Sequence, residues 1–133
     1  MPFDFAFDAP IEPAASTRGQ LNYQSGLAAE DCVLRRYIAQ GAEMLARRWR
    51  GRAGEIDLIF RKGSDVVCVE VKKAATCEAA AERLTFAHLG RVASAAEEFV
   101  GPLADGLLTP LRIDAAMVGE NGDIDVIENI ALT

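Results

Sequence analysis

The sequence has 133 residues, half of them hydrophobic, which fits one domain with its own core and leaves little room for a second. Its formal net charge of −6 at pH 7 argues against general, charge-driven binding to nucleic acid. Three cysteines and one histidine without metal-site spacing argue against a zinc site, and unpaired thiols indicate a reducing, cytoplasmic setting.

Residues 1–20 are predicted to form an N-terminal extension, partly disordered, ahead of a domain over residues 21–133. Three of the five prolines fall in this stretch, which shows no clear hydrophobic periodicity. The alternation of Phe3, Phe5 and Phe7 leaves an edge strand as the alternative. The chain has neither a signal-peptide pattern nor a run of about 18 apolar residues, so we expect no membrane contact.

Residues 26–40 are predicted to form the first helix, with Ser25 capping its start and Gly41 ending it in a left-handed conformation. Its apolar stripe is formed by Leu27, Val33, Leu34, Tyr37 and Ile38. Glu30 lies three residues before Val33 and therefore sits near this stripe. We expect a carboxylate close to the buried side of this helix.

Three strands are predicted next, over residues 44–49, 55–60 and 66–73, separated by a turn over residues 50–54 and a turn at Gly63. Residues 76–84 fit either a loop or a short helix. A long helix is predicted to follow Thr85 as its cap and to run to Val100, where Gly101 and Pro102 end it. The last two predicted strands flank the turn GENGD.

The predicted order is helix, three strands, helix, two strands, which is typical of a small α/β sandwich around a mixed sheet. A long helix between the third and fourth strands allows a crossover connection. We therefore expect this pair of strands to be parallel.

Acidic and basic side chains interrupt the second and third predicted strands. Because side chains alternate along a strand, Glu55 and Asp57 share one face of the second, and Glu70 and Lys72 share one face of the third. The apolar residues expected on the opposite faces are Ile56, Leu58, Phe60, Val67, Val69 and Val71. If the strands pair as a hairpin, the four ionisable groups gather on one patch.

Close carboxylates repel each other, and a divalent cation removes that penalty. Mg²⁺ accepts one or two carboxylates together with waters and phosphate oxygens, and a neighbouring lysine stabilises negative charge on a phosphate. Asp57, Glu70 and Lys72 therefore form a minimal site for metal-dependent hydrolysis of a phosphodiester. The alternative is a solvated polar face with Glu–Lys pairs across the ladder.

The segments GEIDLI and VCVEVKK, in this order, resemble the core of the PD-(D/E)xK nuclease superfamily. More narrowly, they resemble the YraN-like family of bacterial proteins of uncharacterised function. The similarity covers about residues 20–118, from GLAAED in the first helix to LRIDAAMV near the end. It implies a restriction-endonuclease-like sandwich with a central mixed sheet, helices on both faces and the order α-β-β-β-α-β-β.

The resemblance implies a role for each acidic residue. Asp57 would be the central ligand of Mg²⁺ or Mn²⁺, Glu70 the second ligand, and Lys72 the catalytic lysine. Glu30 would approach the metal from the first helix, as the helical carboxylate does in resolvase-like members. Glu55 would either orient a neighbour or bind a second ion. Junction resolvases act as dimers, so a homodimer is expected by the same analogy.

The chain departs from the family pattern at two basic positions. No arginine follows EVKK, and His88 stands where relatives commonly have a lysine. The default interpretation of His88 is a plain surface residue, and the alternative is a phosphate contact. Trp49 is expected in the core, with stacking on an unpaired base as the alternative. The candidate nucleic-acid-binding residues are Arg48, Arg50, Arg52, Lys73, His88 and Arg91.

Two functions follow from these observations. The first is a Mg²⁺- or Mn²⁺-dependent endonuclease acting on DNA, with branched or single-stranded DNA as the candidate substrate. The second is a non-catalytic nucleic-acid or protein interaction module on a nuclease fold. The set of Asp57, Glu70 and Lys72 favours the nuclease, whereas the acidic net charge and the missing basic residues favour the module.

Overall fold

A computed structural model describes residues 18–130, and its first element is helix α1, Arg18–Ala39. The helix begins before the predicted start, so Ser25 lies inside it and the predicted cap is wrong. Gly26, which suggested a boundary, is accommodated within the helix between better helix formers. Residues 18–20 of the expected extension belong to α1, and residues 1–17 lie outside the described part of the chain.

The end of α1 follows the prediction. Gly41 has φ 93°, a left-handed conformation that suits glycine, and the amide of Ala42 donates to the carbonyl of Tyr37 at 3.0 Å. This closure turns the chain directly into the first strand. Along α1, Val33 and Tyr37 are buried as expected. Ile38 is 48% exposed, because the residue next to the buried Tyr37 turns away from the sheet.

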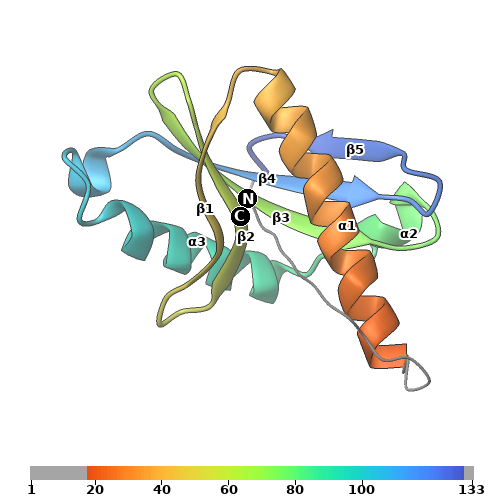
Figure 1. Ribbon diagram of the computed structural model, residues 1–133. Helices are drawn as coiled ribbons and strands as arrows, with labels where there is room; N and C mark the ends of the chain where they lie inside the picture. Colours follow the sequence, from red (N-terminus) through yellow and green to blue (C-terminus); the bar gives the residue numbers. More distant parts are fainter. Residues whose placement is uncertain (1–17, 131–133) are drawn as a thin grey trace.

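Five strands form one sheet in the order β1-β2-β3-β4-β5 (Figure 1). Their bounds are β1 Glu43–Arg50, β2 Glu55–Lys62, β3 Asp65–Lys73, β4 Leu111–Val118 and β5 Ile124–Ile127. All neighbouring pairs are antiparallel except β3 and β4, which run parallel as the crossover predicts.

The crossover between β3 and β4 carries two α-helices, α2 (Cys77–Ala81) and α3 (Phe86–Val100), and the short 3-10 helix η1 (Gly106–Leu108). The ambiguous segment therefore contains a short helix, whose start is capped by Thr76 Oγ1 accepting from the amide of Ala79 at 3.0 Å. Thr85 caps α3 as predicted, with Oγ1 accepting from the amide of His88 at 3.1 Å.

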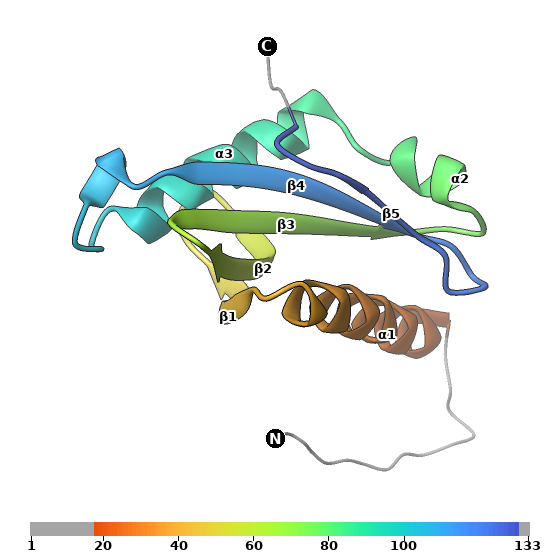
Figure 2. The same ribbon diagram turned by 90° about the horizontal axis from the view of Figure 1, so that it is seen from above.

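Helices cover both faces of the sheet, with α1 on one side and α2 and α3 on the other (Figure 2). The core beneath α1 includes Val33 and Tyr37 from the helix and Leu58, Phe60 and Val69 from the sheet. Tyr37 and Phe60 stack there with ring centroids 4.6 Å apart.

The core beneath α3 combines Val92, Ala96 and Val100 of the helix with Ile59, Val66 and Cys68. Mixed α/β architecture with helices on both faces is thus confirmed.

A fully buried carboxylate, that of Asp114 on β4, joins three parts of the chain. It accepts hydrogen bonds from Tyr37 Oη on α1 at 2.6 Å and from Arg112 Nε and Nη2 at 2.9 and 3.0 Å. The amide of Asn129, beyond β5, donates to the same carboxylate at 2.9 Å. The cluster of Tyr37, Arg112, Asp114 and Asn129, named the Asp114 latch below, ties α1 and the segment after β5 to the sheet.

The three cysteines are free and differ in burial, so we expect them to differ in reactivity. Cys68 is fully buried, and burial together with the nearby Asp114 carboxylate raises the pKa of its thiol to about 12. At pH 8, a chromogenic disulfide reagent is expected to titrate Cys32 and Cys77 in the folded protein and Cys68 only after a denaturant is added. Three thiols reacting at one rate without denaturant would contradict this burial.

Among the described residues, no helix is both long and apolar enough to cross a membrane.

Candidate active site at the end of the β2–β3 ladder

The hairpin of β2 and β3 opens at Asp57. Its ladder runs from the Lys62–Asp65 pair to the Leu58–Val69 pair. At the next position, Asp57 Oδ2 takes the place of a backbone acceptor and receives the hydrogen bond of the Val71 amide at 2.8 Å. Beyond this point β3 stays paired with β4 as far as Lys73. One edge of β3 is therefore available to side chains rather than to backbone.

This opening corrects one prediction. Ile56 was expected to share a face with Leu58 and Phe60, but Ile56 packs in the core beneath α3, whereas Leu58 and Phe60 pack beneath α1. The alternation of β2 breaks at Asp57, because its side chain bonds to the neighbouring strand. The distortion leaves the Asp57 carboxylate between the two layers and beside β3.

Glu70 on β3 is the most enclosed acid of the group, with 5% of its side chain exposed. Its Oε2 atom lies 2.5 Å from His88 Nε2 on α3 and 3.4 Å from Lys72 Nζ. Its Oε1 atom is buried and has no hydrogen-bond partner in the described part of the chain. A buried carboxylate oxygen without a donor is costly, so this atom is a candidate contact for an electropositive ligand.

The two carboxylates strongly affect each other. Burial, followed by repulsion from Glu70, raises the pKa of Asp57 to about 7. Burial is also the main reason that the pKa of Glu70 is raised, although Lys72 acts in the opposite direction. Two acids held together at this energetic cost are typical of functional sites, since packing alone would favour apolar side chains here.

His88 is not the plain surface residue that was the default expectation. Burial, Lys72 and Arg91 lower the pKa of its imidazole, which favours the neutral form. Arg91 Nη2 lies 3.4 Å from Nδ1, so Nδ1 accepts and the Nε2 proton points to Glu70. His88 therefore orients the Glu70 carboxylate.

A pocket of about 550 Å³ opens beside these residues. Its charged lining residues are Glu30, Asp57, Glu70, Lys72, Lys73, Arg83 and Glu120. Four carboxyl groups against three basic groups give a formal charge of −1 when all are ionised, so the lining offers a phosphate no net attraction. A bound divalent cation would reverse this sign.

The residues of the pocket fit Mg²⁺ or Mn²⁺ in number and kind. No group of three His, Cys, Asp or Glu side chains within residues 18–130 has the spacing of a complete metal cage. Mg²⁺ does not require such a cage, because it usually keeps several waters and takes one or two carboxylates plus substrate oxygens. Asp57 and Glu70 would supply that pair, and Glu70 Oε1 has no hydrogen-bond partner among the described residues.

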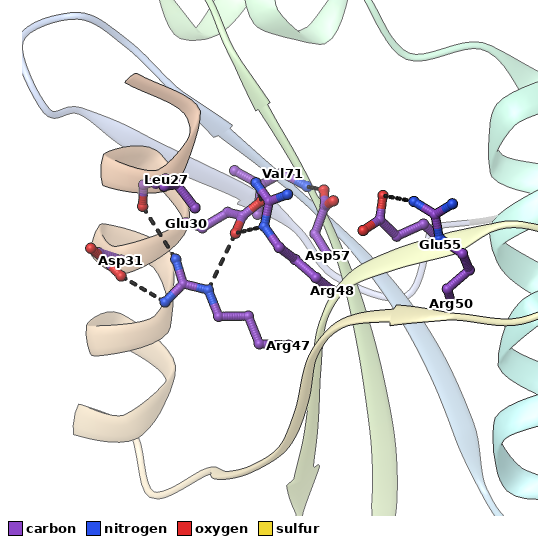
Figure 3. A network of polar contacts seen from close by, with 9 residues as sticks. All are labelled: Leu27, Glu30, Asp31, Arg47, Arg48, Arg50, Glu55, Asp57 and Val71. Atoms are coloured by element: carbon purple, nitrogen blue, oxygen red, sulfur yellow. Dashed lines mark hydrogen bonds and ion pairs between the residues drawn. The ribbon is translucent and has the colours of Figure 1, made fainter. Parts of the chain in front are cut away.

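Glu30 of α1 also lines the pocket, but its carboxylate is already engaged by strand β1 (Figure 3). Oε1 accepts from Arg47 Nε and from Arg48 Nε, each at 3.3 Å, and Oε2 accepts from Arg48 Nη2 at 3.2 Å. Arg47 also bonds to Asp31 at 2.8 Å. Burial is the main cause of the raised pKa of Glu30, and the two arginines oppose it.

Glu55 is not brought to the pocket. Figure 3 shows it on the far side of Asp57 from Glu30, where it forms a 4.0 Å ion pair with the exposed Arg50. The predicted acidic patch therefore contains Glu30, Asp57 and Glu70 with Lys72, and Glu55 lies apart from it.

The predicted basic residues do not all lie at the pocket. Lys73 lines the pocket, His88 adjoins it through Glu70, and Arg91 adjoins it through His88. Arg52 is exposed on the turn between β1 and β2, which packs against α3 where the amide of Ala53 donates to Glu98 at 3.2 Å.

Trp49 lies in the core beneath α3, as expected, and contacts Phe99 edge-on with ring centroids 5.4 Å apart.

Sequence reasoning missed two charged residues of the pocket, Arg83 and Glu120. Both belong to connections, one after α2 and one in the turn before β5, and no periodic pattern marks such positions. It also missed the contact between His88 and Glu70. The only signal for that contact was the place of His88 in the first turn of the long helix that crosses over from β3.

Comparison with known proteins gives a consistent match over most of the chain. The family model described as "Uncharacterised protein family UPF0102" matches residues 29–128. A UPF0102 protein of Ruegeria pomeroyi is 47% identical over 116 residues, which cover 87% of this chain and 94% of the relative. A UPF0102 protein of Cereibacter sphaeroides is 44% identical over 111 residues, covering 84% and 95%. One of Roseobacter denitrificans is 44% identical over 111 residues, covering 84% and 86%.

Proposed function

Because the chain belongs to the uncharacterised protein family UPF0102, within the restriction-endonuclease-like nuclease superfamily, we propose that its pocket is the active site of a metal-dependent nuclease. The proposed reaction is hydrolysis of DNA phosphodiester bonds with Mg²⁺ or Mn²⁺, on branched or single-stranded DNA. The family name assigns no activity, so the proposal rests on the site itself.

One observation carries the proposal. Asp57 and Glu70 are held together in one pocket with Lys72, although burial raises the pKa of both acids and repulsion from Glu70 raises that of Asp57 further. Burial opposes ionisation of both acids, and Glu70 Oε1 has no hydrogen-bond partner among the described residues. A divalent cation and a phosphate are the ligands that would make this arrangement favourable.

The residues of the chain have distinct tasks in this reaction. Asp57 and Glu70 would hold the metal, and His88 and Lys72 fix the orientation of the Glu70 carboxylate. The metal, when bound, polarises a phosphate oxygen and lowers the pKa of a coordinated water. Lys72, with 24% of its side chain exposed, faces the same pocket and is placed to stabilise the charge that develops on the phosphate.

The test is cleavage of plasmid, single-stranded and four-way-junction DNA by the wild-type protein and Lys72→Ala. We expect cleavage in Mn²⁺ or Mg²⁺, none in EDTA, and a loss of about 100-fold or more in Lys72→Ala. Calorimetry with Mn²⁺ alone measures metal binding without turnover.

Cleavage that survives EDTA, or that Lys72→Ala leaves unchanged, would contradict the proposed site. Neither cleavage nor Mn²⁺ binding would favour the non-catalytic interaction module, which the net charge of −6 also favours.

A further inference from the structure

Two consecutive arginines of β1 reach the same carboxylate. Successive side chains of a regular strand point to opposite faces of the sheet. Arg47 and Arg48 nevertheless both donate to Glu30, through Nε atoms that each lie 3.3 Å from Oε1. The backbone of β1 must therefore depart from regular strand geometry at this point.

The departure is visible at Arg48 itself, whose φ is 55°. Such a conformation is strained for a residue with a side chain, and glycine adopts it without strain. The register between β1 and β2 also shifts between Met44 and Ala46, which marks a bulge. An arginine in this conformation inside a strand, where glycine would relieve the strain, points to a role for the arginine side chain itself.

The contact with Arg48 also decides what Glu30 does. Arg48 approaches Glu30 as a fork, with Nε at 3.3 Å from Oε1 and Nη2 at 3.2 Å from Oε2. Both carboxylate oxygens of Glu30 thus accept from arginine, and the Glu30 side chain is only 7% exposed. This geometry suits a carboxylate that orients a guanidinium and is unsuited to a metal ligand.

We infer that Arg48 binds a backbone phosphate of the nucleic acid beside the proposed metal site, and that Glu30 is its positioning residue. This inference rests on the proposed function. Figure 3 shows the Arg48 guanidinium between Glu30 and Asp57, both of which line the pocket. The Arg48 side chain is 36% exposed, and a guanidinium fork matches phosphate oxygens in pairs. Its positive charge offsets the acidic lining that would otherwise repel the phosphate.

The first experiment measures binding of a fluorescent single-stranded oligonucleotide in EDTA over a range of salt concentrations. Arg48→Ala is expected to weaken binding and to lower the slope of log affinity against log salt by about one. Arg48→Lys should keep the slope but bind more weakly than wild type, because lysine lacks the fork. The matched control is Arg35→Ala, which removes one charge from an exposed position on α1 and should leave binding unchanged.

The second experiment separates positioning from metal binding. Glu30→Gln should bind Mn²⁺ as wild type does in calorimetry and should bind the oligonucleotide more weakly. Asp57→Asn should lose Mn²⁺ binding and keep the salt slope. Loss of Mn²⁺ binding in Glu30→Gln would overturn the inference, and so would a wild-type slope in Arg48→Ala. If neither the wild type nor any variant binds Mn²⁺, the proposed metal site is wrong. The salt slope then still tests the role of Arg48.

A stability comparison guards against misfolded variants. Arg48→Gly and Arg48→Ala both lose the ion pair, but only glycine suits φ 55°. Thermal melting should therefore show Arg48→Gly to be the more stable of the two, while both bind DNA equally weakly. Oligonucleotide binding restored in Arg48→Gly would overturn the inference, because relief of strain would then explain the defect.

Discussion

Asp57→Asn is expected to abolish metal-dependent cleavage and to raise the melting temperature. Asparagine keeps an oxygen that accepts the hydrogen bond of the Val71 amide, which Asp57 Oδ2 now receives at 2.8 Å. It replaces an acid whose ionisation is opposed by desolvation and by the Glu70 charge, so the folded state gains stability. The same change removes a proposed metal ligand, and we expect cleavage to fall by at least about 100-fold.

Because stability is expected to rise while activity falls, this variant distinguishes a functional role of Asp57 from a structural one. Replacing a residue needed for folding lowers both stability and activity. Replacing a residue that serves function at a cost in stability lowers activity but raises stability. Thermal melting and the plasmid cleavage assay provide the two readings. The matched control is Asp65→Asn, which makes the same change at the other end of the hairpin, where Asp65 pairs with Lys62. Reduced stability of Asp57→Asn with wild-type cleavage would assign Asp57 to the fold.

Asp114→Ala is expected to have the largest effect on stability. The substitution leaves Tyr37 Oη, the Arg112 guanidinium and the Asn129 amide without their shared acceptor. Removing one partner of a buried, hydrogen-bonded ion pair typically costs about 3–5 kcal/mol. We therefore expect the melting temperature to fall by about 10 °C or more.

Two further variants test this assignment. Asp125→Ala removes an exposed carboxylate from β5, and its free energy of unfolding should stay within about 0.5 kcal/mol of wild type. Tyr37→Phe removes one donor and should cost about 1–3 kcal/mol, an amount that should shrink once Asp114 is absent. Additive losses in the double variant would show that the two side chains act independently.

The regular elements were predictable because their patterns are local. Three strands, the capped helix after Thr85 and the left-handed end of α1 at Gly41 follow from residue types a few positions apart. The start of α1 was missed because Ser25 and Gly26 carry boundary signals that the helix overrides. Local propensity therefore gave the elements and placed one boundary incorrectly.

The gathering of Asp57, Glu70 and Lys72 was predictable from strand periodicity, and the resemblance supplied Glu30. The interactions around them were not predictable. Periodicity assumes a regular strand, yet Asp57 interrupts β2 and Arg48 interrupts β1. The contacts of His88 with Glu70 and of Arg48 with Glu30 depend on these irregularities and on helix packing. Sequence periodicity indicates which residues share a face of a regular strand. It does not indicate where an irregular backbone interrupts the alternation.

The topology of the sheet also bears on the order in which it assembles. Asp57 and Glu70 belong to one hairpin, so the chain brings them together by closing a short loop. The parallel pairing of β3 with β4 must instead wait until residues 74–110 have crossed over. Closing a longer loop costs more chain entropy, and contacts distant in sequence form more slowly. The hairpin that carries the repelling acids is therefore expected to form early, and the pairing of β4 that brings Asp114 to Tyr37 is expected to complete folding.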